Sequence, residues 1–533
     1  MTTLPDATHH SLIAGEPAKG TDGVVRAIDP ARNEETGPEF TTLAESQEQA
    51  AAEAAAEAFG IYRKLTDADR AAFLTTVAEN INAAGEEIIA TAMTETGLPQ
   101  QRLTGELART VNQLKMFAKL VANGDHHSVR TEPALPDRTP LPRPDLRQRK
   151  LPLGPVVVFG ASNFPLAFST AGGDTASALA AGCPVIFKAH LAHPGTGLLV
   201  AQAIAKAVAD HNLPAGVFSL VYGRGTTVGQ SLVKHPAIKA VGFTGSRFGG
   251  TSIMATAAAR PEPIPVYAEM SSVNPVMVLD SAIKGDSTAL AEGFITSLNG
   301  SAGQLCTVPG LIFVPGDETG DTFLANVKNA LAETAGVTML TPGICSSRVQ
   351  GEKRLTSMPG VTEVGRGTDG QTANALGPAV FSTDVETFLT HKELSEEIFG
   401  ATCLAVRYAS AGELQKVASR IEGQLTATLH LDTEDPGDVA LAADLVELLE
   451  LKAGRVLVNG WPTGVDVGDA IVHGGPFPAT SDGRSTSVGT AAIDRFQRLV
   501  AYQNLPAALH PAPVHEDNPW DVPQRTDFLS QLR

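Results

Sequence analysis

The sequence predicts an α/β fold, in which helices cover a largely parallel sheet. Two short apolar runs, residues 155–159 (PVVVF) and 184–188 (PVIFK), are typical of strands that are buried on both faces. A helical stretch separates them, and the spacing of roughly 30 residues is that of a βαβ unit. Strand-like and helix-like segments alternate again after Pro275, so we expect a second α/β lobe there.

Residues 40–120, which precede these strands, are predicted to form helices. The segment 44–60 is rich in Ala, the strongest helix former. Thr66 and Asp69 make a T-x-x-D pattern that satisfies free amides at the start of the next helix. Apolar side chains then recur every three or four residues and define one buried face: Phe73, Val77, Ile81, Ala84 and Ile88.

The same patterns place the later elements. We expect helices from about Pro165 to Ala181 and around 195–210, followed by strands at 216–222 and 240–243. In the second lobe, strands are expected at 276–280 and 311–315 and a helix at 322–334. Residues 121–150 are polar and rich in Pro, which excludes a helix and allows an edge strand or an extended arm. The tail beyond about residue 505 is also polar and rich in Pro, so we expect it to lie over the surface.

Composition excludes several classes of protein. The 533 residues carry 40 Lys and Arg against 58 Asp and Glu, a net charge of −18, which argues against binding to nucleic acid or to an acidic membrane. The four cysteines form no C-x-x-C pair and fit a reducing cytoplasm better than a disulfide framework. Residues 1–20 lack the pattern of a signal peptide, and no apolar run approaches the ~20 residues that span a bilayer. We expect a soluble cytoplasmic protein of several domains.

Three single residues are candidates for catalysis, although each has an ordinary structural interpretation. Cys306 lies between Gly303 and Gly310 in a small-residue loop that a substrate could approach, yet a lone cysteine is usually a small buried residue. Glu269 follows an apolar run, where an exposed carboxylate is common. Asn163 lies between a strand and a helix, where Asn often caps the helix.

Three further segments are candidates for ligand binding. Gly245 and Gly250 in 243–250 (FTGSRFGG) would let backbone amides approach a phosphate, although the spacing also fits an ordinary strand-to-helix turn. Lys188 ends an apolar strand, at the edge of the sheet where ligands gather in open α/β folds. Residues 396–400 (EEIFG) could equally be a solvated acidic turn.

Taken in order along the chain, these motifs resemble the aldehyde dehydrogenase family. The resemblance rests on Asn163-Phe164-Pro165, Lys188, FTGS, Glu269, GQLC ending at Cys306 and EEIFG, and it extends through LPAGVFSLV and AGRVLVNG over roughly residues 10–505. It implies an aldehyde-dehydrogenase-like α/β fold with a Rossmann-type cofactor domain, a catalytic domain and an oligomerisation arm. It divides the chain into an NAD(P)-binding domain (1–130 and 151–270), a catalytic domain (271–470), oligomerisation elements (131–150 and 471–505) and a C-terminal tail (506–533).

The resemblance also implies roles for the catalytic candidates. Cys306 is then the nucleophile, which attacks the aldehyde carbon and later carries a thioester. Asn163 and the backbone N–H of Cys306 form the oxyanion hole, and Glu269 is the general base that activates water. No metal is implied.

Roles in cofactor binding follow in the same way. Lys188 is expected at the adenosine ribose, and Ser246 with the Gly245–Gly250 turn at the pyrophosphate. Glu397 and Phe399 are expected at the nicotinamide ribose and ring. The family members imply a homodimer or a homotetramer.

The sequence departs from the family pattern at two positions, Leu191 and Ala401. NAD-preferring members have a Glu where this sequence has Leu191, and that carboxylate would repel a 2′-phosphate. The resemblance therefore implies that NADP is bound, with NAD accepted as well, and His190 would assist only if it were protonated. Ala401 replaces the Pro that usually follows EEIFG, with no consequence that we can derive.

Some segments resemble one branch of the family more closely. Residues 160–197, 269–278 and 473–490 resemble enzymes that oxidise 2,5-dioxopentanoate (α-ketoglutarate semialdehyde) and an NADP-linked fatty aldehyde dehydrogenase. We expect oxidation of 2,5-dioxopentanoate to 2-oxoglutarate, with a longer aliphatic aldehyde as the alternative substrate. A catalytically inactive structural relative is the remaining alternative, and the presence of Cys306, Glu269 and Asn163 together argues against it.

Overall fold

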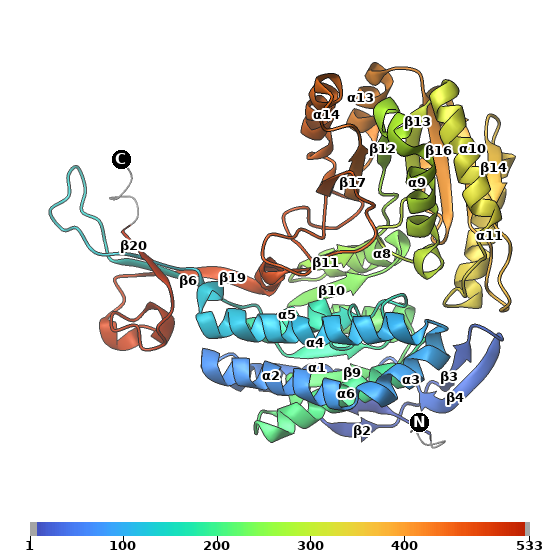
Figure 1. Ribbon diagram of the computed structural model, residues 1–533. Helices are drawn as coiled ribbons and strands as arrows, with labels where there is room; N and C mark the ends of the chain where they lie inside the picture. The colour runs from blue at the N-terminus through green and yellow to red at the C-terminus, as the bar shows by residue number, and fades with distance from the viewer. Residues whose placement is uncertain (1–7, 528–533) are drawn as a thin grey trace.

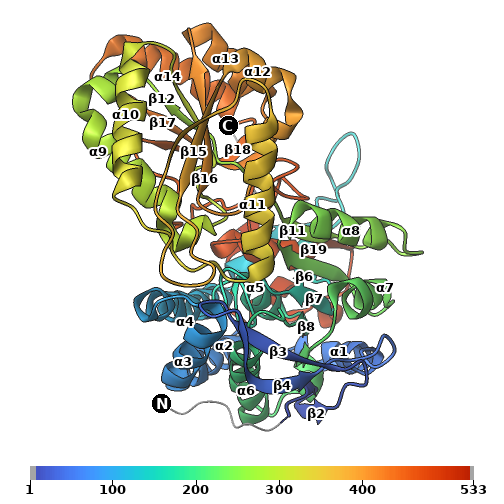
Figure 2. The same cartoon turned by 90° about the vertical axis from the view of Figure 1, so that its right-hand side faces the viewer.

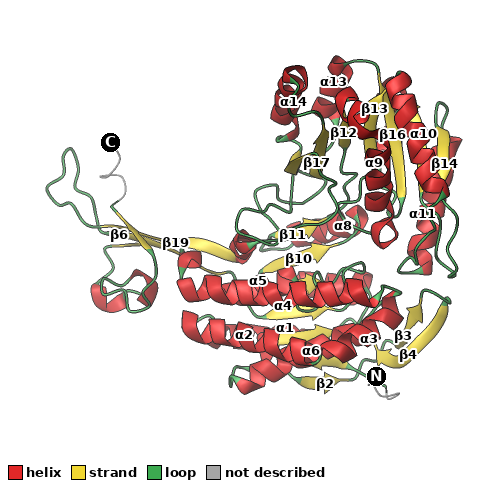
Figure 3. Ribbon diagram, viewed as in Figure 1, coloured by secondary structure: helices red, strands yellow, loops and turns green. Residues whose placement is uncertain are grey.

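The computed structural model describes residues 8–527. Two α/β bodies lie against each other, and a narrow arm projects to one side of the first body (Figure 1). Each body is built on its own seven-stranded sheet. Helices, strands and loops are distributed over both bodies, whereas the arm consists mainly of strands and loops (Figure 3).

The first sheet has the strand order β11-β10-β7-β8-β9-β1-β2. Strands from β11 through β9 are parallel to their neighbours, and β1 pairs antiparallel with β9 and with β2. Every residue of β7, β8 and β9 is buried, as their continuous apolar sequences predict. The strands are β1 (Ser11–Ile13), β2 (Glu16–Ala18), β7 (Val156–Phe159), β8 (Val185–Lys188), β9 (Phe218–Val221), β10 (Ala240–Thr244) and β11 (Val266–Glu269).

Helices cover both faces of this sheet (Figure 2). Val156 and Val158 of β7 join the core formed with α2, α4, α5 and α6, while Val157 and Phe159 join the core formed with α1, α7 and α8. This alternation follows from the strand period of two residues. The helices are α1 (Gln49–Tyr62), α2 (Asp67–Ala83), α3 (Gly85–Thr96), α4 (Gln100–Asn123), α5 (Gly173–Ala181), α6 (Pro194–Asp210), α7 (Gln230–Lys234) and α8 (Arg247–Ala258).

The predicted start of α2 is confirmed, but the predicted start of α5 is wrong. Thr66 Oγ1 accepts a hydrogen bond from the Asp69 N–H at 3.1 Å and caps α2. The helix expected from Pro165 begins only at Gly173, because residues 165–172 form turns instead. One reason is that Glu106 of α4 accepts two backbone N–H groups of this segment, those of Leu166 and Ala167, at 2.9 Å each. A side chain from another helix thus satisfies donors at the place where a first helical turn was expected.

The second sheet has the strand order β14-β15-β16-β13-β12-β17-β18. It is parallel throughout except for the edge pair β14 and β15. Its strands are β12 (Val276–Val278), β13 (Leu311–Pro315), β14 (Thr362–Arg366), β15 (Ala379–Asp384), β16 (Thr402–Tyr408), β17 (Gln424–His430) and β18 (Ala453–Val458). Its helices are α9 (Asp280–Asn299), α10 (Glu318–Ala332), α11 (Pro342–Ser357), α12 (Val385–Thr390), α13 (Ala411–Arg420) and α14 (Pro436–Leu449).

The projecting arm is a four-stranded sheet in the order β19-β6-β5-β20. It combines β5 (Val129–Glu132) and β6 (Leu146–Pro152) with β19 (Gln497–Gln503) and β20 (Gln524–Thr526) from the end of the chain. The predicted Pro-rich segment therefore does form an arm, and the C-terminal tail folds back onto it. A separate hairpin, β3 (Val24–Asp29) and β4 (Glu34–Thr41), lies at the edge of the first body. Within the described residues, we find no helix of the length and apolar character needed to cross a bilayer.

Candidate active site

The thiol of Cys306 lies in a strained loop between α9 and β13. Three consecutive residues of this loop have left-handed backbone conformations: Ser301 (φ 51°), Ala302 (φ 58°) and Gly303 (φ 68°). Such conformations are costly for residues other than Gly and cluster at functional sites. A Cβ atom on Gly303 would lie 2.2 Å from the backbone N of Ala401, so only glycine fits there.

The buried side chain of Asn274 fixes the end of this loop. Asn274 Nδ2 donates to the carbonyl oxygens of Cys306 and Val308, each at 2.9 Å. Asn274 Oδ1 accepts from the hydroxyls of Ser272 and Thr426. The backbone that carries the thiol is therefore attached to both the end of the first sheet and β17.

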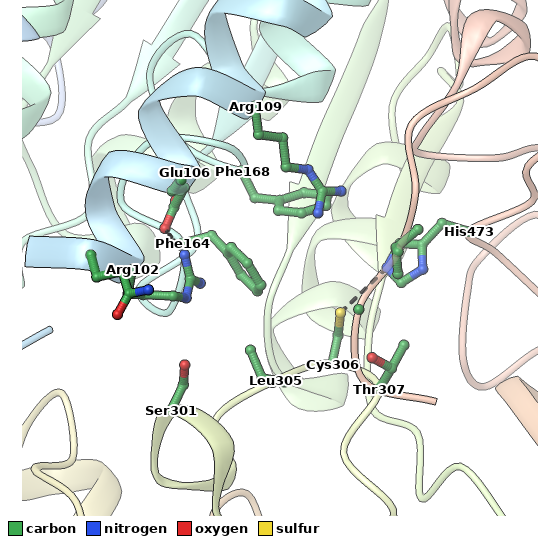
Figure 4. Close-up of a pocket in the computed structure, with 14 residues that line it drawn as sticks. Arg102, Glu106, Arg109, Phe164, Phe168, Ser301, Leu305, Cys306, Thr307 and His473 are labelled. Carbon is green, nitrogen blue, oxygen red and sulfur yellow. Dashed lines mark hydrogen bonds and ion pairs between the residues drawn. The ribbon is translucent and has the colours of Figure 1, made fainter. Parts of the chain in front are cut away.

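A chain of hydrogen bonds leads from the thiol to a buried carboxylate, and Figure 4 shows its first step, from Cys306 to His473. Cys306 Sγ lies 3.3 Å from His473 Nε2, which lies 2.9 Å from Glu269 Oε1. The Ser487 hydroxyl donates to Glu269 Oε2 at 2.8 Å. His473 and Glu269 are buried, and the donor and acceptor atoms of Cys306, His473 and Glu269 lie within 4.8 Å of one another.

Opposite charges stabilise this group. Burial by itself raises the pKa of Glu269, but the positive charge of His473 and hydrogen bonds from His473, Ser487 and Cys306 outweigh it and lower the pKa. Burial lowers the pKa of His473, but the negative charges of Glu269 and Cys306 and its hydrogen bonds raise it overall. At neutral pH the pair is therefore a carboxylate and an imidazolium.

The direction of the hydrogen bonds follows from this charge state. An ionised carboxylate only accepts, so His473 Nε2 must carry the proton that faces Glu269. The same nitrogen lies 3.3 Å from Cys306 Sγ, so one ring atom contacts both the carboxylate and the sulfur.

Asn163 lies beside the same loop. Its Nδ2 donates to the carbonyl oxygen of Gln304 at 3.0 Å. The side chain is thus directed toward the backbone next to Cys306 and does not cap the following helix.

A cavity of about 820 Å³ lies between the two bodies. Cys306, Glu269 and Asn163 line its inner end, and the predicted ligand residues Gly245, Ser246, Glu397 and Phe399 line it as well. The Ser246 hydroxyl caps α8 by accepting from the Gly249 N–H at 3.2 Å, so the start of this helix opens toward the cavity. Burial raises the pKa of Glu397 to about 7, against opposing hydrogen bonds from Ser271 and Ser272.

Two of the predicted ligand residues do not line this cavity. Gly250 lies in the first turn of α8, where a Cβ would come within 2.6 Å of Met270 Sδ, so it permits close packing of the helix on the sheet. Lys188 is the last residue of β8 and is buried. Its side chain has no hydrogen-bond or ion-pair partner among the described residues. Burial lowers the pKa of Lys188 to about 8, which leaves it mainly charged at neutral pH. Such a cation fits a site that receives an oxygen-rich ligand.

His190 does not supply a second positive charge. Burial and the neighbouring charges of His193 and Lys188 lower its pKa well below the ordinary value, so the ring is neutral at pH 7. His190 lines the large cavity, and its ring stacks on that of His193 at 5.5 Å. Leu191 is half-buried and packs against the first core, with no carboxylate at its position.

A second cavity of about 430 Å³ opens on the other side of Cys306. Figure 4 shows its lining, with Arg109 next to Phe168 and Arg102 next to Phe164. Both arginines belong to α4. Because Cys306 lines both cavities, its thiol lies where they meet.

Sequence reasoning placed Cys306, Glu269 and Asn163 correctly around one point but missed His473. His473 belongs to 471–505, a segment expected to serve oligomerisation. Its residues 473–490 instead run beside β11: the Met270 N–H donates to the Ala479 carbonyl, and Ser487 reaches Glu269. A lone histidine has no local pattern, so only its position in space reveals it.

Two groups of described side chains bring possible metal ligands within 4.8 Å of one another. One is Glu269, Cys306 and His473, and the other is Asp67, His126 and His127. Hydrogen bonds already join ligand atoms in each group, including His127 Nε2 to Asp67 Oδ2 at 2.9 Å. We therefore assign no metal to either.

This chain is similar in sequence and in fold to known proteins. A model of the aldehyde dehydrogenase family matches residues 18–476. Alpha-ketoglutaric semialdehyde dehydrogenase 2 of Azospirillum brasilense is 50% identical over 521 residues, which cover 98% of this chain and 99% of the relative. Alpha-ketoglutaric semialdehyde dehydrogenase of Acinetobacter baylyi is 43% identical over 512 residues, 96% of each chain. The solved structure of 1-pyrroline-5-carboxylate dehydrogenase from Thermus with bound NAD aligns with a TM-score of 0.78 at 21% identity and covers 93% of both chains.

The strained loop gives a first prediction. Gly303→Ala forces a Cβ into the backbone of Ala401 and a left-handed conformation onto alanine. We expect the rate of Cys306 alkylation by iodoacetamide and the value of kcat/KM to fall at least about tenfold. Gly300→Ala is the matched control, because a Cβ there meets nothing closer than 3.9 Å. Equal rates in the two variants would contradict the requirement for glycine at 303.

Proposed function

The chain belongs to the aldehyde dehydrogenase family, and we propose that it oxidises 2,5-dioxopentanoate (α-ketoglutaric semialdehyde) to 2-oxoglutarate with a nicotinamide cofactor. The observation that carries this proposal is the position of Cys306 at the meeting point of two cavities. The larger cavity has room for a dinucleotide and the smaller one for a short aldehyde. The names of the two relatives above, which match this chain over nearly its full length, support the choice of substrate.

The smaller cavity also supports the alternative substrate. Phe164, Phe168, Leu305 and Val465 give it an apolar lining that suits an aliphatic aldehyde. Arg109, which lines the same cavity and forms no ion pair among the described residues, favours an acidic substrate instead. We therefore propose the semialdehyde as the substrate and treat the aliphatic aldehyde as the competing candidate.

In the proposed reaction, Cys306 is the nucleophile. The imidazolium of His473 lies 3.3 Å from Cys306 Sγ and places a positive charge beside the attacking sulfur, and Glu269 balances that charge. Attack on the aldehyde carbon gives a thiohemiacetal whose oxygen is negatively charged. Asn163 Nδ2 and the Cys306 N–H donate to that oxygen, and each such donor contributes about 3 kcal/mol in comparable reactions.

The residues of the larger cavity fit a nicotinamide dinucleotide. The open start of α8 at Gly245 and Ser246 suits a pyrophosphate, and Glu397 and Phe399 suit the nicotinamide riboside. Lys188, two residues before the cavity-lining His190, is the proposed partner of the adenosine ribose. A bound nicotinamide supplies the oxidising group, as acceptor of the hydride from the substrate carbon. The product on the protein is a thioester at Cys306.

Glu269 is the proposed base for hydrolysis of the thioester. Its lowered pKa keeps it ionised at neutral pH, and one of its carboxylate oxygens lies within 4.8 Å of Cys306 Sγ. The bonds from His473 and Ser487 hold the carboxylate in this position. A water molecule beside the thioester would give its proton to Glu269 as it attacks, which releases the acid.

An aldehyde panel tests the substrate. We expect kcat/KM for 2,5-dioxopentanoate to exceed that for decanal at least about tenfold, with succinate semialdehyde between them, because a buried cation favours an acidic substrate. NAD(P)H formation gives the rates, and Cys306→Ala is the inactive control. A higher kcat/KM for decanal would overturn the substrate proposal.

The role of His473 predicts a pH-dependent effect. The raised pKa of His473 keeps its ring positively charged through neutral pH. This charge beside Cys306 Sγ is lost only as the pH rises through the pKa of His473. We expect iodoacetamide to alkylate Cys306 about tenfold more slowly in His473→Gln at neutral pH, with a smaller difference at alkaline pH. Mass spectrometry gives the rates, and His391→Gln is a control distant from the thiol. A ratio that does not change with pH would contradict this role.

Cofactor preference is tested at Leu191. We propose that NADP is used at least as efficiently as NAD, because no carboxylate at this position repels the 2′-phosphate. Leu191→Glu should lower kcat/KM for NADP about tenfold relative to NAD, while the uncharged Leu191→Gln changes the ratio much less. A strong preference of the unaltered enzyme for NAD would contradict the proposal.

A further inference from the structure

Two arginines of α4 extend toward the smaller cavity on one face of the helix. Arg102 and Arg109 are seven residues apart, which is close to two helical turns, and both line the cavity. Each guanidinium lies over an aromatic ring (Figure 4). Arg102 Cζ is 4.5 Å from the centre of the Phe164 ring, and Arg109 Cζ is 5.4 Å from the centre of the Phe168 ring. Their charge environments are different.

The charge of Arg102 is already neutralised. Its Nη1 donates to Glu106 Oε2 at 2.5 Å, four residues along the same helix. Glu106 is buried, and its other oxygen accepts the N–H groups of Leu166 and Ala167. Arg102 therefore completes a network that also shapes the turn after β7.

Arg109 has no such partner. Its Nε and Nη2 atoms are shielded from solvent and make no hydrogen bond, and the side chain forms no ion pair among the described residues. Burial lowers its pKa, and the negative charges of Cys306, Glu106 and Glu269 act in the opposite direction. An arginine keeps its proton in such surroundings, so a largely unpaired guanidinium lies beside the substrate cavity.

A third arginine near the thiol does not share this property. Arg455 of β18 donates through Nη1 to the Gly464 carbonyl at 2.9 Å and through Nη2 to the Pro462 carbonyl at 2.6 Å. It lies behind the cavity wall that Gly464 and Val465 form. Arg109 is thus the cavity-lining guanidinium that lacks a protein acceptor in the part of the chain described.

We propose that Arg109 binds the carboxylate of the aldehyde substrate and selects aldehydes that carry an acid group. Guanidinium and carboxylate form charge-assisted hydrogen bonds, and the ligand would supply the acceptor that the protein omits. Arg109 and Cys306 line the same cavity, so a short substrate with its carboxylate at Arg109 can present its aldehyde group to the thiol. This inference rests on the proposed function, which it extends from a substrate to the residue that recognises it.

Steady-state kinetics with matched substrates test the proposal. Arg109→Gln should raise KM for succinate semialdehyde and 2,5-dioxopentanoate roughly 10- to 100-fold, with a smaller change in kcat, because it removes a charged hydrogen-bond donor. The KM for butanal, which lacks the carboxylate, should change less than about twofold. Arg109→Lys should restore part of the lost affinity. Lys115→Gln makes the same change of charge at an exposed position of α4 and should have no effect.

A binding measurement separates this proposal from the proposed function. Glutarate, a dicarboxylate that the enzyme cannot oxidise, should protect Cys306 from iodoacetamide in the unaltered protein, and the protection should be lost in Arg109→Gln. Equal loss of activity toward butanal and the semialdehydes, or unchanged protection by glutarate, would overturn the role of Arg109. If the unaltered enzyme instead prefers decanal to 2,5-dioxopentanoate, the proposed function fails whatever glutarate does.

Discussion

The ion pair between His473 and Glu269 is the interaction on which the candidate site depends. It connects three distant parts of the chain: the end of β11, the segment that follows β18, and the loop that carries Cys306. Both charged groups are buried, so neither has water to replace its partner. Its position between the two α/β bodies makes the chemistry of the thiol dependent on their correct packing.

The two cavities impose a second constraint on the thiol. A substrate carbon must reach the sulfur from one side while the cofactor approaches from the other, so the Cys306 loop must be exposed to both. The left-handed backbone before Cys306 and the anchoring bonds of Asn274 produce that exposure. The net charge of −18 does not decide the local potential, because His473 and Arg109 both lie beside Cys306 in the smaller cavity.

Much of the fold could be predicted because its strands and helices have strong local patterns. The strands at 156–159 and 185–188 are apolar throughout since both of their faces are covered, and Thr66 marks the start of α2. The exception is the segment 165–172, whose sequence is compatible with a helix. There Glu106, about 60 positions earlier, accepts the backbone N–H groups, and such a long-range contact leaves no local pattern.

The sequence by itself determined the order of the motifs and, through them, the family resemblance and the candidates Cys306, Glu269 and Asn163. Tertiary structure alone decided what surrounds them. His473 lies 167 residues from Cys306 along the chain, and Arg109, unlike Arg102, forms no ion pair among the described residues. Neither fact has a local signature, because the pKa of a side chain and its hydrogen-bond partners depend on which distant segments pack around it.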